Sequence, residues 1–169
     1  MQLILISGLS GSGKTTLSEA LKTELDKKGI PSVLLDGDEM RQGISNDLGF
    51  SEEERGENVR RTAEIAKLVG KSGVNVICAL ISPFGKDRLS ARNLLSNFHY
   101  VEVFVDTPLE ICEKRDSKGY YKKARIKEII NFTGIDSLYE RPDSPEIIIN
   151  TDGTPTQESV ETILTYLLR

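Results

Sequence analysis

The 169-residue chain contains no tryptophan, a single histidine and only two cysteines. Cys78 and Cys112 are far apart and form no C-x-x-C pair, so neither a disulfide framework nor a zinc site is indicated. A reducing cytoplasm is therefore the expected compartment. His99 precedes an apolar run and is interpreted as structural. No apolar run approaches the roughly 20 residues that a membrane span needs, and no signal peptide is evident, so no membrane partner is expected.

Excess positive charge is also lacking, because the formal net charge is −4. A general nucleic-acid-binding protein is normally basic, so nucleic acid is not an expected partner. A small anionic ligand held by a local basic patch remains compatible with this charge. The length suits one domain with a hydrophobic core of its own.

Short apolar runs alternate with helical patterns along the whole chain. The runs predict five strands at residues 3–6, 32–35, 74–81, 100–105 and 147–149. Because these runs are apolar on both faces, they favour a parallel sheet covered by helices on both sides. The sequence thus predicts a three-layer α/β fold with a five-stranded parallel sheet, in which the first strand is central.

Helix starts are predicted from capping patterns. Three capping boxes are expected, at Ser51 with Glu54, Thr107 with Glu110, and Thr154 with Gln157. Pro108 and Pro155 are expected at the first helical position, where the missing N–H is tolerated.

Residues Gly8 to Thr15 match the phosphate-loop pattern G-x-x-x-x-G-K-[ST]. The motif follows an apolar run and opens a helix, as its mechanism requires. Its glycines let backbone N–H groups surround phosphate oxygens, and the helix N-terminus adds partial positive charge. Lys14 can reach the terminal phosphates, and the Thr15 hydroxyl can ligate Mg²⁺. The loop therefore predicts a nucleoside triphosphate site.

Two further polar groups follow predicted strands, where ligands bind in open α/β sheets. In Asp36-Gly37-Asp38, one carboxylate could hold Mg²⁺ through water or accept a proton from an attacking hydroxyl. Ser82, in the sequence Ile-Ser-Pro-Phe after the third strand, is a possible nucleophile, but no histidine is near it in the sequence. Asp106 is interpreted mainly as a turn and cap residue.

Arginines and an aromatic residue follow the acidic pair. Arg41 lies one helical turn after Asp38, and Arg55 and Asn58 share one helix face. Guanidinium groups suit phosphate or sulfate oxygens, but each arginine could equally be a solvated surface charge. Phe50 could stack on a base or staple the start of its helix.

Residues 114–127 carry seven basic side chains and one acidic one. Gly119, Tyr120 and Tyr121 interrupt this segment with a potential hinge and two aromatic rings. In phosphoryl transfer, a basic lid brings positive charge over the phosphates and excludes water. The alternative interpretation is a solvated basic helix.

Seven motifs, in this order and spacing, make the chain resemble the adenylylsulfate kinase (APS kinase) family. They are GLSGSGKTT at 8–16, DGDEMR at 36–41, DLGFSEEERGENVRR at 47–61, ISPFGKDR at 81–88, EVFVDTPLEICEKRD at 102–116, KGYYKKAR at 118–125 and NFTGIDSLYE at 131–140. The resemblance implies a P-loop NTPase fold, with residues 1–169 forming a single kinase domain and a lid at about 114–135. It also implies a cytoplasmic homodimer that uses ATP and Mg²⁺ to phosphorylate the 3′-hydroxyl of adenylyl sulfate in sulfate assimilation.

The resemblance also implies roles for individual residues. The implied catalytic residues are Asp38, Lys14 and Ser82, with Thr15 and Asp38 as the metal site. The implied ATP-binding residues are Gly8, Leu9, Ser10, Gly11, Ser12, Gly13, Lys14, Thr15, Thr16 and Arg115. The implied acceptor-binding residues are Asp38, Arg41, Phe50, Arg55, Asn58, Ile81, Ser82, Lys118, Asn131 and Phe132, with Phe50 and Phe132 on either side of the adenine. Ser82 matches the family's phosphoenzyme serine, although direct in-line transfer needs no covalent intermediate.

Some positions depart from the family pattern, which keeps other acceptors open. Leu138 stands where proline is frequent, and Ile126-Lys127 replaces a commoner small pair. One alternative is a related kinase for another nucleotide-activated acceptor, such as cytidine diphosphoramidate in capsule or polysaccharide synthesis. Another is a non-catalytic nucleotide-binding module or GTPase-like switch. The absence of an N-K-x-D motif disfavours a GTPase, and the presence of Lys14, Thr15 and Asp38 disfavours a dead binder.

Overall fold

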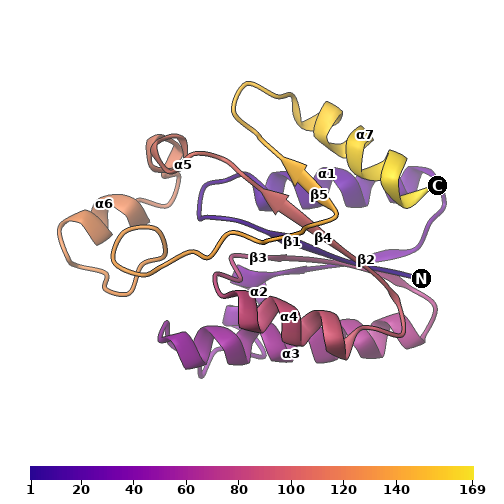
Figure 1. Ribbon diagram of the computed structural model, residues 1–169, viewed down its shortest axis with the longest axis horizontal. Helices are drawn as coiled ribbons and strands as arrows, with labels where there is room; N and C mark the ends of the chain where they lie inside the picture. The colour runs from indigo at the N-terminus through magenta and orange to yellow at the C-terminus, as the bar shows by residue number, and fades with distance from the viewer.

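Five parallel strands form one sheet in the order β2-β3-β1-β4-β5 (Figure 1). The computed structural model describes all 169 residues. The strands are β1 (Gln2–Ser7), β2 (Ser32–Asp36), β3 (Asn75–Leu80), β4 (His99–Val105) and β5 (Ile147–Ile149). All five lie within two residues of the predicted runs, and β1 is central. The predicted α/β class and parallel sheet are thus confirmed.

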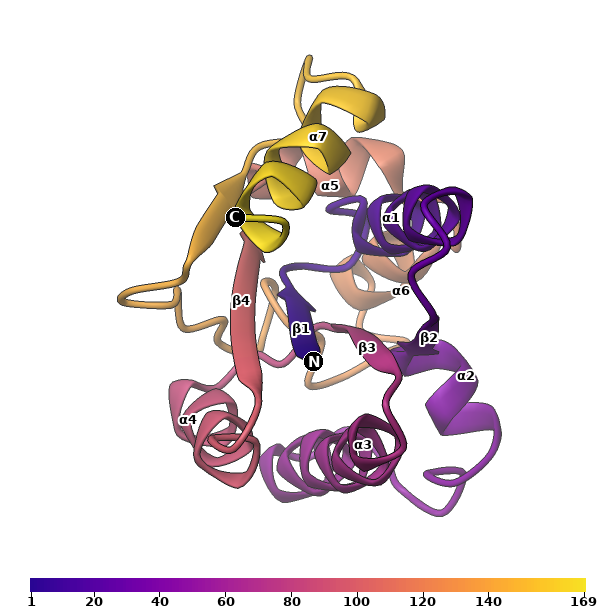
Figure 2. The same cartoon turned by 90° about the vertical axis from the view of Figure 1, so that its right-hand side faces the viewer.

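Helices cover both faces of the sheet, as the view along the strands shows (Figure 2). The helices are α1 (Lys14–Lys27), α2 (Gly37–Gln42), α3 (Glu52–Lys71), α4 (Gly85–Leu94), α5 (Leu109–Arg115), α6 (Tyr120–Arg125) and α7 (Thr156–Leu167). Helices α1 and α7 pack on one face through a core cluster of 15 buried residues. Helices α3 and α4 cover the other face, over a cluster of 11. None of the helices is long and apolar enough to cross a membrane.

One predicted capping box is confirmed and two are wrong. At the start of α3, Ser51 accepts the N–H of Glu54 and the Glu54 carboxylate accepts the N–H of Ser51. Helices α5 and α7 have Pro108 and Pro155 at the N-cap, one position earlier than predicted, and no side-chain cap. The Thr107 hydroxyl is instead engaged with the carbonyl of Ser12, so it caps nothing. Thr154 lies one position before the N-cap of α7, so its side chain is not at the position from which a helix is capped.

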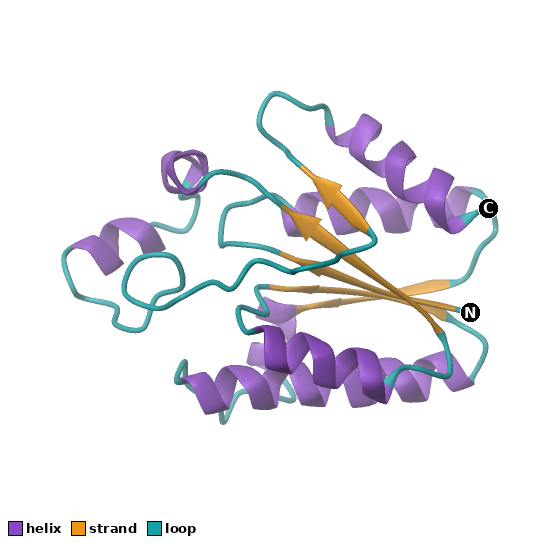
Figure 3. Cartoon of the chain, viewed as in Figure 1, coloured by secondary structure: helices purple, strands orange, loops and turns teal.

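Helices α5 and α6 and the loop that follows them extend beyond the carboxyl edge of the sheet (Figure 3). This region has a small core of its own, made of Cys112, Tyr121, Ala124 and Phe132, against which Leu9 packs. The rings of Tyr121 and Phe132 meet edge to face at 4.9 Å. Residues 114–135, called the lid segment below, are therefore folded against the phosphate loop.

Candidate functional site

The phosphate loop joins β1 to α1 and depends on its glycines. Gly11 has a φ of +72°, and a Cβ there would come within 2.8 Å of the Cys112 carbonyl oxygen. A side chain at Gly8 would lie 2.7 Å from the carbonyl oxygen of Val105. These close approaches to backbone hold the loop between β4 and α5 and leave little tolerance for any other residue.

Lys14 begins α1, and only 9% of the residue is exposed. Its ammonium donates to the carbonyl of Leu9 at 2.6 Å. Burial lowers the pKa of Lys14 to about 8, although the carboxylates of Asp36 and Asp38 act in the opposite direction. A cation held inside the loop in this way is placed to exchange the Leu9 carbonyl for phosphate oxygens.

A second group of contacts holds the loop from the other side. The carbonyl of Ser12 accepts hydrogen bonds from the hydroxyls of Thr151 at 2.8 Å and Thr107 at 3.2 Å. Arg115 donates to the Thr151 hydroxyl at 2.7 Å and to the Gly11 carbonyl at 3.4 Å. Arg115 thus lies beside the phosphate loop, close to the other predicted ATP-binding residues. Thr107 and Thr151 were missed by the sequence analysis, because their partners lie 95 and 139 positions away.

The carboxylates of Asp36 and Asp38 have different partners. Asp36 is buried, and its carboxylate accepts from the Thr15 hydroxyl at 2.9 Å and from the N–H of Asp38 at 2.8 Å. The Asp38 carboxylate instead forms an ion pair with Lys118 of the lid segment. Burial lowers the pKa of Lys118, but this ion pair outweighs it and raises the pKa overall. Asp36, rather than Asp38, is therefore the carboxylate in contact with Thr15.

Arg55 contacts two other predicted acceptor residues, Phe50 and Asn131. Its guanidinium donates to the Phe50 carbonyl at 3.0 Å and to the Asn131 carbonyl at 2.6 Å, which links the start of α3 to the end of the lid segment. Phe132 follows directly, buried against Tyr121. Phe50 is 54% exposed, and the guanidinium of Arg41 lies 4.4 Å from its ring centroid. The Phe50 ring is therefore held by cations while it stays open to a ligand.

Among the predicted acceptor-binding residues, two buried side-chain oxygens have no hydrogen-bond partner. They are Oδ1 of Asn58 and Oγ of Ser82, in residues that are 6% and 3% exposed. Buried polar atoms are normally satisfied, so both oxygens are available to a polar ligand. Ser82 also has a φ of +44°, which is uncommon for a residue other than glycine.

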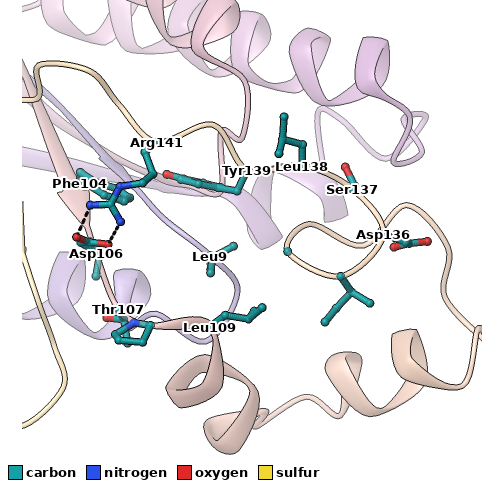
Figure 4. Close-up of a pocket in the computed structure, with 14 residues that line it drawn as sticks. Leu9, Phe104, Asp106, Thr107, Leu109, Asp136, Ser137, Leu138, Tyr139 and Arg141 are labelled. Carbon is teal, nitrogen blue, oxygen red and sulfur yellow. Dashed lines mark hydrogen bonds and ion pairs between the residues drawn. The ribbon is translucent and has the colours of Figure 1, made fainter.

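A cavity of about 530 Å³ lies beside this site, between the end of β4 and residues 134–141 (Figure 4). Of the site residues named above, Leu9 and Thr107 line it. At its rim, Asp106 forms a two-pronged ion pair with Arg141, with both distances at 2.6 Å. Asp106 lies in the connection between β4 and α5, so its interpretation as a turn residue holds. Its interpretation as a cap residue is wrong, because Arg141 engages both carboxylate oxygens and α5 has no side-chain cap.

Comparisons with known proteins agree on one family. Residues 1–150 match the family model for adenylylsulphate kinase. An adenylyl-sulfate kinase of Clostridium acetobutylicum is 52% identical over 161 residues, which cover 95% of this chain and 80% of the relative. The structure of an APS kinase of Mycobacterium tuberculosis in complex with AMPPNP and APS is 40% identical, with a TM-score of 0.96 over 99% of this chain and 98% of that one. A hexameric APS kinase of Thiobacillus denitrificans is 31% identical, with a TM-score of 0.73 over 98% of this chain and 28% of that one.

Proposed function

The chain belongs to the adenylylsulphate kinase family, and on that premise we propose that it transfers the γ-phosphate of ATP to the 3′-hydroxyl of adenylyl sulfate. The products are ADP and 3′-phosphoadenylyl sulfate. Residues 1–169 act in this proposal as one kinase domain, with the lid segment closing over the acceptor. Two copies are expected to associate as a homodimer, which a molar mass measured by light scattering tests.

The observation that carries the proposal is the position of helix α2 between the two halves of the site. The helix is only six residues long. Asp38 lies near its start, next to the Asp36 that contacts Thr15 of the phosphate loop. Arg41, one turn later, contacts Phe50 of the acceptor group. The Asp38 carboxylate therefore lies between an acceptor hydroxyl bound on the Phe50 side and the phosphates bound by the phosphate loop.

Each residue then has a defined part in the transfer. Asp38 orients the attacking hydroxyl and accepts its proton. Lys14 and the N–H groups of the phosphate loop neutralise charge on the transferred phosphoryl group. Lys118 leaves Asp38 for the anionic acceptor, and the lid segment excludes water that would hydrolyse ATP. Ser82 binds the acceptor through its unpartnered hydroxyl and forms no covalent intermediate.

The oxygen atoms around Thr15 fit a magnesium ion. A hydroxyl and a carboxylate lie 2.9 Å apart, and both are hard oxygen ligands of the kind that Mg²⁺ prefers. Thr15 would hold the ion directly, with Asp36 or Asp38 acting through water. When bound with ATP, the ion would supply positive charge that offsets the negative charge of the phosphates.

The test is a product assay with purified protein, ATP, Mg²⁺ and either adenylyl sulfate or cytidine diphosphoramidate. We expect turnover with adenylyl sulfate. Turnover with the cytidine compound alone would assign the chain to the alternative acceptor. With neither acceptor phosphorylated, the kinase proposal fails.

A matched pair of variants tests the role of Asp38. Asp38→Asn keeps the shape of the side chain but removes the base, and we expect kcat to fall about 100-fold or more. Asp47→Asn is the control, since Asp47 pairs with Arg61 on the surface. Equal activity in the two variants would remove Asp38 from the mechanism.

A further inference from the structure

Three successive carbonyl groups at the end of β3 are each held by a different part of the chain. The carbonyl of Ile81 accepts from the N–H of Gly8 in the phosphate loop at 3.4 Å. The carbonyl of Pro83 accepts from the N–H of Glu140 at 2.8 Å. Between them, the carbonyl of Ser82 accepts from the guanidinium of Arg88 at 2.7 Å. One of these three donors is thus a side chain, which a substitution can remove.

The guanidinium of Arg88 joins three further groups while it is almost wholly buried. The residue is 4% exposed. Its second terminal nitrogen donates to the Glu140 carbonyl at 2.7 Å, and its Nε lies 3.1 Å from the carboxylate of Glu102 on β4. The ring of Tyr139, drawn in Figure 4, lies 5.9 Å from the centre of the guanidinium. A planar fork of donors suits this arrangement, and a lysine ammonium does not.

The contacts of Glu140 extend this connection toward the lid segment. Its carboxylate accepts from the N–H of Gly85 at 2.6 Å, in addition to the bonds made by its own N–H and carbonyl. The chain that returns from Phe132 is therefore fastened to the start of α4 through one residue. Ser82 directly precedes Pro83, whose carbonyl is bound by Glu140. Phe132 lies eight positions before Glu140 in the sequence.

Ser82 needs such support because of its backbone conformation. A φ of +44° is unfavourable for a residue with a side chain, and it persists only where the surroundings impose it. The bond from Arg88 acts on the carbonyl of this residue. The direction of the buried Ser82 hydroxyl therefore depends on Arg88.

We propose that Arg88 is a positioning residue for the acceptor. By binding the carbonyls of Ser82 and Glu140, Arg88 fixes the distance between the Ser82 hydroxyl and the end of the lid segment. The kinetic part of this inference rests on the proposed kinase activity. Arg88 touches neither substrate in this arrangement. Its effect is exerted on the acceptor pocket and not on the phosphate loop.

Arg92 provides a control on the same helix, one turn later, with a side chain that is 32% exposed against 5% for Arg88. It forms ion pairs with Glu102 at 3.2 Å and Glu146 at 2.7 Å, so it belongs to the same charge network. It makes no contact with Ser82 or Glu140. Because Arg88 is the more deeply buried of the two, a purely structural role predicts a larger loss of stability in Arg88→Lys, but no selective change in the KM for adenylyl sulfate.

The experiment compares Arg88→Lys with Arg92→Lys in full-length protein. For Arg88→Lys, we expect the KM for adenylyl sulfate to rise about tenfold and the KM for ATP to change by less than about twofold, because a charge-assisted hydrogen bond is lost on the acceptor side alone. Arg92→Lys should leave both values within about twofold of the wild type. Equal effects of the two variants, or equal rises in both KM values, would overturn the proposal.

Hydrogen–deuterium exchange gives a second measurement that needs no acceptor. Peptides covering residues 80–86 and 137–142 should exchange faster in Arg88→Lys than in the wild type and Arg92→Lys, since they contain the amides of Gly85 and Glu140. Unchanged exchange in Arg88→Lys refutes the positioning role. If the wild type does not turn over adenylyl sulfate, the proposed function fails, and the exchange comparison still decides whether Arg88 holds these two segments in place.

A second variant covers the case in which Arg88→Lys does not fold. The double substitution Arg88→Gln with Glu102→Gln removes both charges of the buried pair, so no unpaired charge is left inside the protein. This variant still lacks the guanidinium group that donates to the carbonyls of Ser82 and Glu140. The same selective rise in the acceptor KM and in exchange is expected, and its absence overturns the proposal.

Discussion

The pH dependence of ATP binding follows from the burial of Lys14. Its ordinary pKa is 10.5, and burial in the phosphate loop lowers the value to about 8. The ammonium form is the one that attracts phosphate, so the free protein loses its binding-competent form as the pH rises past 8. Bound phosphates favour the charged form, and ATP binding above pH 8 therefore takes up a proton.

The magnitude is set by the fraction of Lys14 that keeps its proton. With a pKa of about 8, roughly one tenth of the free protein is protonated at pH 9, so the Kd for ATP should be about tenfold higher at pH 9 than at pH 7.5. With an unshifted pKa, the loss at pH 9 would be only a few per cent. The two cases differ by far more than the error of a binding measurement.

Calorimetric titration with ATP, without acceptor, between pH 7.5 and 9.5 measures this effect. Repeating the titration in buffers of different ionisation enthalpy gives the proton uptake directly. Lys14→Arg is the control, because a guanidinium stays charged throughout this range and the slope should vanish even where affinity is lower. A flat Kd in the wild type, or the same slope in Lys14→Arg, would refute the reasoning.

The same pKa shift has a consequence for the stability of the protein without ATP. Above pH 8 the folded protein has lost the Lys14 proton, while the unfolded chain keeps it up to about pH 10.5. The unfolded state then binds more protons, so this group makes the free energy of unfolding rise with pH in that window.

Two further substitutions have defined outcomes. Ser82→Ala should raise the KM for adenylyl sulfate a few-fold, with kcat kept within about tenfold, because direct transfer needs no serine nucleophile; in a steady-state assay, essentially complete loss of turnover would favour a phosphoenzyme. Ser51→Ala removes the side chain that caps α3, and we expect a loss of about 1 kcal/mol of stability in urea unfolding without a change in either KM. A cost near zero would mean that the capping box at Glu54 contributes little.

The sheet could be predicted because each strand is a local signal. Residues 147–149 are only three isoleucines, yet they match β5 in full, because β-branched residues favour strands. Burial on both faces does not account for this edge strand, since Ile147 and Ile149 are buried but Ile148 is exposed. The phosphate loop is equally local, because eight consecutive residues carry its geometry. The start of α3 was found for the same reason, with Ser51 and Glu54 three positions apart.

Contacts between distant residues could not be predicted. Asp36 and Asp38 both follow β2, and only the hydrogen bond to Thr15 shows that Asp36 is the one beside the loop. Thr107 fits a capping pattern, but its hydroxyl is engaged by the loop 95 positions earlier. The part played by Arg88 depends in the same way on Glu140, 52 positions later, which no local pattern reveals.

The packing of the lid segment on the phosphate loop makes the two substrate sites thermodynamically dependent on each other. Tyr121 donates to the carbonyl of Ser10 at 2.8 Å, and the carbonyl of Cys112 lies against Gly11, so neither part can move far without disturbing the other. A nucleotide that stabilises the loop then also stabilises the position of Phe132, which is expected to contact the acceptor in the proposed reaction. By thermodynamic linkage, if bound ATP raises the affinity for the acceptor by a given factor, bound acceptor raises the affinity for ATP by the same factor.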